Sequence, residues 1–431
     1  MITRFFVAGF KPFGAQGKTV ELAPLTIFVG PNGSGKTSLM EAMALLAQSA
    51  SWSQGGLRWG RGQLVDPVWA ELPEPPACLH RGSFGQILRL GACLQIPAAP
   101  SPSPLSVEYV VEHRLHDRGK GDWVHAISLT PGVHARRVHR LAQQAFGTAS
   151  WTDKLEIQGV DLRPSGSADR VFGPETFMSA QVDPNVRAQY DGILAALEAG
   201  RRFCQERFSY IGPERGPSRI DRNTEGKPPR TVGKRGEATV RVLSRLFSSE
   251  GQSAAAGTVQ KWAHKFGLAS LHAGWSGGKE LACDFRDGAT DTVVSFDMAG
   301  FGSVQLLPVI VELFASTPPC TILVEEPEIS LHPQAVAELP LMFADAVQGG
   351  RQVIVATHSD GLLADLHRIV GAGFPATKIK VVHFRRQGDD VEIKDLPISK
   401  DGLVEGWVPS FCDAEDRSAK EWLDKVGGSV P

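Results

Sequence analysis

The feature that most constrains this chain is an eight-residue motif near its start. Residues 30–37 read GPNGSGKT, which matches the pattern G-x-x-x-x-G-K-[ST], and they follow a β-rich apolar run at residues 25–29. Apolar side chains then recur at helical spacing at Leu39, Met43 and Leu46. A glycine-rich loop between a strand and a helix can turn several backbone N–H groups toward one phosphate. The sequence therefore predicts an α/β fold with a P-loop nucleotide site.

Nine residues of this loop and the start of its helix are predicted to bind the nucleotide. They are Gly30, Pro31, Asn32, Gly33, Ser34, Gly35, Lys36, Thr37 and Ser38. Lys36 would neutralise charge on the β- and γ-phosphates, which also makes it a catalytic candidate, and the Thr37 hydroxyl would bind Mg²⁺. The expected cofactors are ATP and Mg²⁺.

Two later strands end in polar side chains suited to the same chemistry. The run at residues 321–324 ends in Glu325 and Glu326, and the run at 353–356 is followed by His358. Because ligands bind at the carboxyl ends of strands in open parallel sheets, Glu325 is predicted to hold Mg²⁺ and Glu326 to polarise the attacking water. His358 would point at the γ-phosphate. An acidic strand end and an ordinary surface or core histidine are the alternative interpretations.

The order and spacing of these motifs resemble the ATP-binding-cassette (ABC) class. Lys36 and Glu325 are 289 residues apart, so a whole lobe lies between them. Residues 300–307 occupy the position of a signature loop, shortly before the acidic strand, and open a predicted helix. This resemblance implies that Gly300, Gly302 and Gln305 contact the nucleotide of an opposite subunit. The alternative is a glycine turn that caps an ordinary helix.

Further motifs are similar to those of bacterial AAA-family ATPases related to RecF, SMC heads and OLD proteins, a group that includes the ATPase subunit of Septu antiphage defence. They lie at residues 10–14, 210–219, 232–237, 326–333 and 401–413. Three positions depart from the common pattern: Glu325 replaces a more usual Asp, Gly300 a frequent Ser, and Ala356 an often acidic residue.

The chain of 431 residues is longer than one average core requires. We expect an ABC-type P-loop ATPase head in three parts: an antiparallel β-rich N-terminal lobe with the P-loop (1–190), a helical insertion (191–278), and a C-terminal parallel-sheet lobe with the signature, acidic and histidine motifs (279–431).

Composition excludes several classes of protein. The net charge of −2 gives no overall basic field for nucleic acid, so DNA binding would depend on local clusters, which are equally well explained as solvated faces. These clusters are Arg136, Arg137 and Arg140, and Arg219, Arg222, Lys227, Arg230, Lys234 and Arg235. The six scattered cysteines disfavour a disulfide framework or a zinc site. No apolar run is long enough to predict a membrane span or a signal peptide, so a cytoplasmic location is expected.

The sequence thus predicts a Mg²⁺-dependent ABC-type ATPase that self-associates into dimers or higher oligomers. The resemblance implies that its ATP state controls a separate effector, such as a nuclease, in antiphage defence. The chain itself shows no nuclease motif after His358. Two alternatives remain: a RecF-like DNA-binding ATPase of repair or maintenance, and a scaffold locked by nucleotide with negligible turnover.

Overall fold

The computed structural model of the chain shows two large sheets with a helix between them. The described residues are 1–50, 78–80, 87–96, 105–115, 121–130, 133–143, 149–157, 160–162, 195, 199–200, 202–216, 229–248, 254–276 and 280–406. The arginines of the first basic cluster lie on a strand, whereas Arg219, Arg222 and Lys227 of the second, and residues 407–413 of the C-terminal motif, lie outside the described residues.

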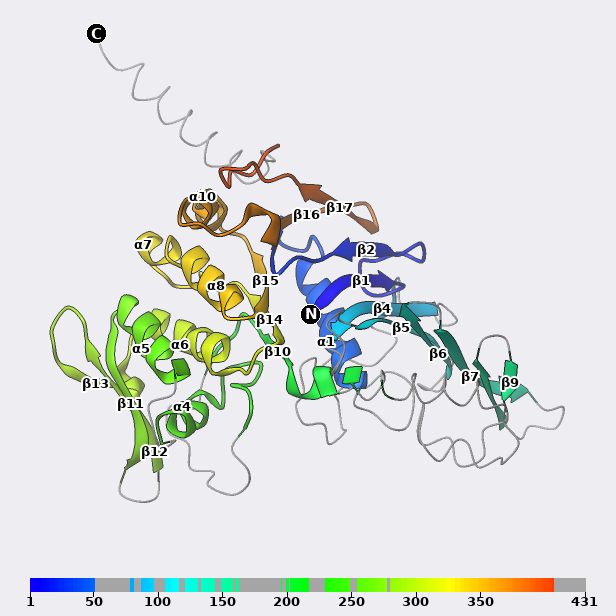
Figure 1. Cartoon of the computed structure of the whole chain (residues 1–431), viewed down its shortest axis with the longest axis horizontal. Helices are drawn as coiled ribbons and strands as arrows, with labels where there is room; N and C mark the ends of the chain where they lie inside the picture. The colour runs from blue at the N-terminus through cyan, green and yellow to red at the C-terminus, as the bar shows by residue number, and fades with distance from the viewer. Residues whose placement is uncertain are drawn as a thin grey trace, which may run out of the picture.

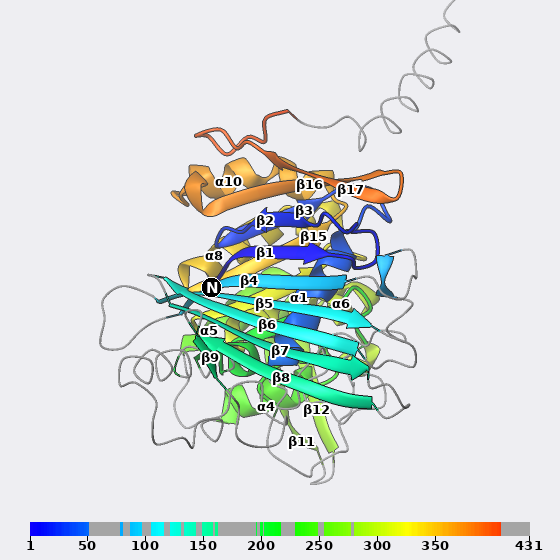
Figure 2. The ribbon, with the colours of Figure 1, turned by 90° about the vertical axis from the view of Figure 1, so that its right-hand side faces the viewer.

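The first sheet has eight antiparallel strands in the order β2-β1-β4-β5-β6-β7-β8-β9. They are β1 (Ile2–Ala8), β2 (Lys18–Glu21), β4 (Ile87–Ile96), β5 (Leu105–Leu115), β6 (Gly121–Thr130), β7 (Val133–Gln143), β8 (Ala149–Ile157) and β9 (Val160–Leu162). This confirms the predicted antiparallel character of the N-terminal part. Figure 2 shows these strands side by side across one face of the molecule.

The second sheet has six strands in the order β10-β14-β15-β3-β16-β17. They are β10 (Phe208–Ile211), β14 (Cys320–Glu325), β15 (Arg351–Thr357), β3 (Leu25–Val29), β16 (Ile379–Gln387) and β17 (Asp390–Leu396). The first five are parallel, and β17 pairs antiparallel with β16. All residues of β3, β10 and β14 are buried, as expected for parallel strands covered on both faces.

Helices cover both faces of this parallel sheet (Figure 1). On one face, α1 (Lys36–Ala50) shares a core with the antiparallel sheet and with Phe28, Leu323 and Ile354 of the parallel sheet. On the other face, the core contains α6 (Phe301–Ala315), α8 (Leu339–Gln348) and α10 (Leu366–Gly371). The structure therefore confirms the predicted α/β class and places the helix that follows the P-loop between the two sheets.

A smaller layer packs beyond α6. It consists of α4 (Thr239–Ser248), α5 (Ala254–Lys265) and a sheet of β11 (Leu268–Ser276), β12 (Glu280–Asp287) and β13 (Val293–Ser295). The range 191–278 is therefore not wholly helical, because it also contains β10 and β11. A bulge between Ala269 and His272 interrupts the alternation of inward and outward side chains in β11. Hydrophobic periodicity in the sequence therefore does not reveal this strand. No described helix is long and apolar enough to span a membrane.

The three predicted sequence ranges all contribute strands to the parallel sheet. β3 comes from 1–190, β10 from 191–278, and the other four strands from 279–431. Since β3, β14 and β15 are parallel and adjacent in the order β14-β15-β3, their carboxyl ends lie at one edge. This edge carries the motifs that the sequence analysis singled out.

Candidate nucleotide-binding site

The P-loop connects β3 to α1 and has the backbone that its glycines allow. Gly33 has a φ of +73°, which side chains other than glycine rarely adopt. A Cβ on Gly30 would lie 2.2 Å from the Phe384 carbonyl oxygen, so only glycine fits where the loop crosses β16. The Ser34 hydroxyl is buried and has no hydrogen-bond partner among the described residues, which is consistent with a ligand-binding loop.

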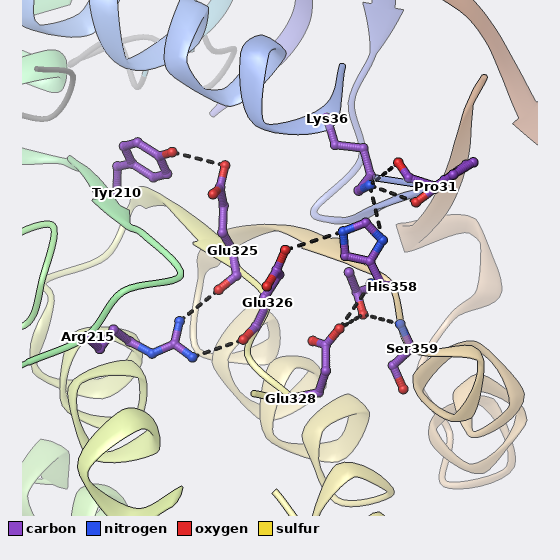
Figure 3. A network of polar contacts seen from close by, with 11 residues as sticks. Pro31, Lys36, Tyr210, Arg215, Glu325, Glu326, Glu328, His358 and Ser359 are labelled. Carbon is purple, nitrogen blue, oxygen red and sulfur yellow. Dashed lines mark hydrogen bonds and ion pairs between the residues drawn. The ribbon is translucent and has the colours of Figure 1, made fainter. Parts of the chain in front are cut away.

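Lys36 folds back over this loop (Figure 3). Its Nζ donates to the carbonyl oxygens of Gly30 at 2.7 Å and Pro31 at 3.1 Å and lies 3.4 Å from His358 Nδ1. The side chain is buried, and burial lowers the pKa of the ammonium group to about 8, although the nearby Glu326 and Glu325 act in the opposite direction. A phosphate group would supply this ammonium with anionic partners in place of two neutral carbonyl groups.

Glu325 ends β14 as a buried carboxylate. Tyr210 Oη donates a hydrogen bond to its Oε1 at 3.0 Å, and the Thr37 hydroxyl also bonds to the carboxylate. Burial raises the pKa of Glu325 to about 7, since hydrogen bonds from Tyr210 and Thr37 only partly offset the loss of water. The buried Glu325 carboxylate and the exposed Thr37 hydroxyl next to it form an arrangement that favours a bound cation.

The donor set fits Mg²⁺ with ATP. Mg²⁺ is commonly held by one or two protein oxygens and completed by water and phosphate oxygens. Thr37 and Glu325 supply such a pair, and no group of three or more His, Cys, Asp or Glu residues suited to a metal occurs in the part of the chain that the structure describes. Thr37 and Glu325 are therefore the residues that would hold the ion.

Glu326 and His358 contact each other at the same edge of the sheet. His358 Nε2 lies 3.3 Å from Glu326 Oε1, and each side chain is about one-third exposed. In the tautomer in which Nδ1 accepts from the Lys36 ammonium, Nε2 carries the proton directed at Glu326. This arrangement needs neutral imidazole, and burial together with the Lys36 charge lowers the pKa of His358 accordingly.

The backbone directs the Glu326 carboxylate away from its strand. Glu326 has a φ of +44°, which is unusual for a residue with a side chain, while its N–H still bonds to the Ala356 carbonyl oxygen at 2.8 Å. The two consecutive carboxylates therefore leave the strand in different environments. Glu325 is buried beside Thr37 and Tyr210, whereas Glu326 faces His358.

Tyr210, Arg215 and Glu328 lie within the motifs at residues 210–219 and 326–333, but the sequence alone assigned none of them a role. Glu328 Oε1 accepts hydrogen bonds from the Thr357 hydroxyl at 2.5 Å and from the His358 backbone N–H at 3.0 Å. It thereby fixes the turn that presents the imidazole. The cluster of Glu325, Glu326 and Glu328 is visible in the sequence, but the partners of these carboxylates are revealed only by strand order.

The structure separates the three predicted signature residues. Gly300 is the N-cap of α6, and a Cβ built on it would meet no described atom within 4 Å. A Cβ on Gly302 would lie 2.7 Å from the Ser330 carbonyl oxygen. Gln305 is buried, and both ends of its amide pair with the backbone of Arg215. Gln305 is therefore not placed to contact a nucleotide, and its polar side chain is explained by packing inside the subunit.

Two pKa values near neutrality predict a narrow pH optimum. Below about pH 7 the Glu325 carboxyl is protonated and loses its attraction for Mg²⁺, and above about pH 8 Lys36 is neutral and loses its attraction for phosphate. We expect kcat/KM for Mg-ATP to rise through the first value and to fall through the second, because kcat/KM reports the free protein. Steady-state ATPase assays over a range of about pH 6 to 9, at constant ionic strength, test this prediction. A flat profile would contradict it.

The strand, phosphate loop and helix of β3 and α1, together with the side chains at the carboxyl ends of β14 and β15, form a candidate P-loop nucleotide site. Two family models match the chain: one described as "AAA domain" over residues 6–51, and one described as "AAA domain, putative AbiEii toxin, Type IV TA system" over residues 222–364. The first match contains the P-loop, and the second contains the signature segment, the carboxylates and His358. No curated protein matches the chain.

Solved structures similar to this chain include SMC heads. The Smc head domain with a coiled coil and joint from Pyrococcus yayanosii has 11% sequence identity and a TM-score of 0.48, and covers 96% of this chain and 99% of its own. The Smc head domain with an extended coiled coil from Pyrococcus furiosus, bound to the C-terminal domain of ScpA, has 12% identity and a TM-score of 0.47, with 97% and 98% covered. The SMC head domain from Thermotoga maritima has 10% identity and a TM-score of 0.39, with 92% and 99% covered.

Proposed function

We propose that this protein is a Mg²⁺-dependent ATP hydrolase. The observation that carries the proposal is the convergence of Lys36, the two carboxylates and His358 at one edge of the parallel sheet, although these residues lie far apart in sequence. When bound between Thr37 and Glu325, Mg²⁺ would neutralise phosphate charge. The experiment is ATP turnover by the purified chain with and without Mg²⁺.

Each polar side chain would have one role in this reaction. Lys36 would exchange the carbonyl oxygens of Gly30 and Pro31 for phosphate oxygens and stabilise the charge that develops on them. Glu326 would orient water and accept its proton, since its carboxylate is the more exposed of the pair. His358, held neutral, would donate from Nε2 to a phosphate oxygen or to Glu326.

We further propose that the protein self-associates and that the start of α6 meets the nucleotide of a second copy. Three features support this. The N-terminus of α6 offers backbone amides suited to an anion, and the P-loop of the same subunit already serves its own nucleotide. Met298 and Phe301 flank Gly300 with exposed fractions of 80% and 61%, and large apolar side chains at that exposure favour burial at an interface.

A charge added at Gly300 tests the shared site. Gly302 is unsuitable, because any side chain there would meet the Ser330 carbonyl group, whereas Gly300 is open and has ordinary backbone angles. We expect Gly300→Asp to abolish ATPase activity by like-charge repulsion, while nucleotide binding to the isolated subunit is retained. Gly300→Ala is the matched control and should remain active.

Mixing two inactive variants distinguishes sharing in trans from a defect within one subunit. Gly300→Asp subunits retain a normal P-loop, and Lys36→Ala subunits retain a normal α6, so a mixed dimer has one complete site. Random pairing makes about half of the dimers mixed, and recovery should approach about one quarter of the parental activity. Absence of any recovery in a verified mixture would contradict the shared site.

We propose that the ATP state of this cytoplasmic assembly controls a separate effector, such as a nuclease, in antiphage defence. This rests on the motif resemblance and on an interface that would open and close with the nucleotide. Co-expression with the product of the adjacent gene, followed by co-purification with and without ATP, tests it.

A clamp on DNA receives less support from the described basic residues. Arg230 pairs with Glu206 at 3.1 Å, and Lys234 Nζ lies 5.1 Å from the centre of the Tyr210 ring.

A further inference from the structure

We propose that Arg215 is a positioning residue that joins the start of α6 to the two carboxylates, so that they move as one unit. The inference deepens the proposed ATPase function and rests on it. Arg215 follows β10 and is 2% exposed, although arginine is seldom buried without strong partners. Its side chain lies between the end of β14 and α6 (Figure 3).

The guanidinium group binds backbone carbonyl oxygens of three segments. Nη1 donates to Gly212 at 2.8 Å and to Glu325 at 2.7 Å, and Nη2 donates to Glu326 at 2.9 Å. Nε donates to Gln305, in the second turn of α6, at 2.6 Å. A planar fork of donors is needed for this set, and lysine, with one ammonium group, cannot reproduce it.

The Gln305 side chain in turn binds the backbone of Arg215. Its N–H donates to Gln305 Oε1 at 3.2 Å, and its carbonyl oxygen accepts from Gln305 Nε2 at 2.5 Å. Arg215 and Gln305 therefore bind each other through both backbone and side chain, which explains why the structure buries an amide at a position predicted to face nucleotide. The contact fixes α6 against the β10 segment.

The contact with Glu326 bears on catalysis. Glu326 has a φ of +44°, and the direction of its carboxylate depends on this uncommon backbone. Arg215 Nη2 fixes the carbonyl oxygen, while Ala356 fixes the N–H. The guanidinium group also lies among the charges of Glu328, Glu326 and Glu325, which offset part of the cost of burying it.

This network links the metal-binding and water-orienting carboxylates to the exposed end of α6. Gly300 and Phe301 lie at that end, on the surface proposed to meet a second copy. A shift of Glu325 or Glu326 on hydrolysis would displace Arg215 through these hydrogen bonds, and Arg215 would in turn displace Gln305. The state of the phosphate would thereby reach the subunit interface.

Arg215→Lys tests the proposal against a matched control. Arg207 also donates to backbone carbonyl oxygens, but it is less buried and lies at the amino ends of β10 and β14, where Nη1 binds Thr317 at 2.8 Å and Pro318 at 3.1 Å. We expect Arg215→Lys to lower kcat by about 10- to 100-fold, as misplacement of a reacting group does, while the Kd for a fluorescent ATP analogue changes by less than about threefold. Arg207→Lys should change neither.

Gln305→Met gives a second test that keeps the arginine in place and fills a similar volume. It should lower kcat by about three- to tenfold with unchanged nucleotide affinity. Hydrogen exchange should speed up at residues 301–305 and 326–330 in both variants, and not in Arg207→Lys. This readout does not depend on turnover.

The outcomes separate the positioning role from the ATPase itself. If the parental protein fails to hydrolyse ATP, the proposed function is wrong, yet the exchange data still decide whether Arg215 joins the two segments. If the parental protein is active and Arg215→Lys has the parental kcat and exchange pattern, the positioning role is wrong. A loss of kcat that merely follows the loss of folded protein or of ATP affinity in both variants would also overturn it.

Discussion

Replacing Lys36 with alanine is expected to abolish ATP binding, and with it hydrolysis, while leaving the fold intact. Among the described residues, the hydrogen-bond partners of the Lys36 side chain are two backbone carbonyl oxygens and His358 Nδ1, and Glu325 and Glu326 act on its charge from further away, so its removal costs the folded protein little. The bound triphosphate, in contrast, loses its main cationic partner on the protein. We expect affinity for a fluorescent ATP analogue to fall by about 100-fold or more, and turnover to become undetectable.

Thermal unfolding of the Lys36→Ala protein should occur within about 3 °C of the parental midpoint, which separates loss of the site from loss of the fold. Lys261→Ala is the matched control. Lys261 pairs with Asp345 at 3.0 Å on the outside of the molecule, and its loss should leave ATP binding unchanged. Parental turnover by well-folded Lys36→Ala protein would refute the assignment of the site.

Glu326→Gln is expected to slow hydrolysis by about two orders of magnitude or more while ATP still binds. The amide keeps the shape of the carboxylate but cannot accept a proton from water. Single-turnover ATP hydrolysis measures the chemical step, and equilibrium binding of the same nucleotide measures affinity.

The contrasting variant is Glu325→Gln. Its buried side chain lies beside Thr37, so the change should weaken Mg²⁺-dependent binding first and raise the Mg²⁺ concentration needed for half-maximal activity. If Glu325→Gln spares Mg²⁺-dependent binding and Glu326→Gln destroys it, the two roles are reversed.

Local motifs predicted the phosphate loop and the strand-end carboxylates, because each is a short pattern with its own chemistry. The neutral state of His358 was beyond this reasoning. It depends on contacts with Lys36 and Glu326, which lie 322 and 32 residues away in the chain. Only the strand order β14-β15-β3 brings these three side chains together.

Gln305 shows the limit of reasoning from position alone. A polar residue in the first turns of a helix after a glycine loop suggests a ligand contact, and its spacing from Glu325 fits that interpretation. Its real partner is the backbone of Arg215, 90 residues earlier, and no sequence pattern encodes such a contact. Arg215 is a better guide to the site than Gln305, because its side chain also binds the backbone of Glu325 and Glu326.

The position of β3 in the parallel sheet also determines when the site can form during protein synthesis. β3 ends at residue 29, but both of its neighbours, β15 and β16, lie between residues 351 and 387. At ribosomal rates of about 5–20 residues per second, the two strands that pair with β3 are synthesised roughly 15 to 70 s after β3 itself. During that interval the P-loop has been made, but the strands that hold it, and the carboxylates it works with, have not. A nascent chain therefore cannot complete this site until the segment up to residue 387 has left the ribosome.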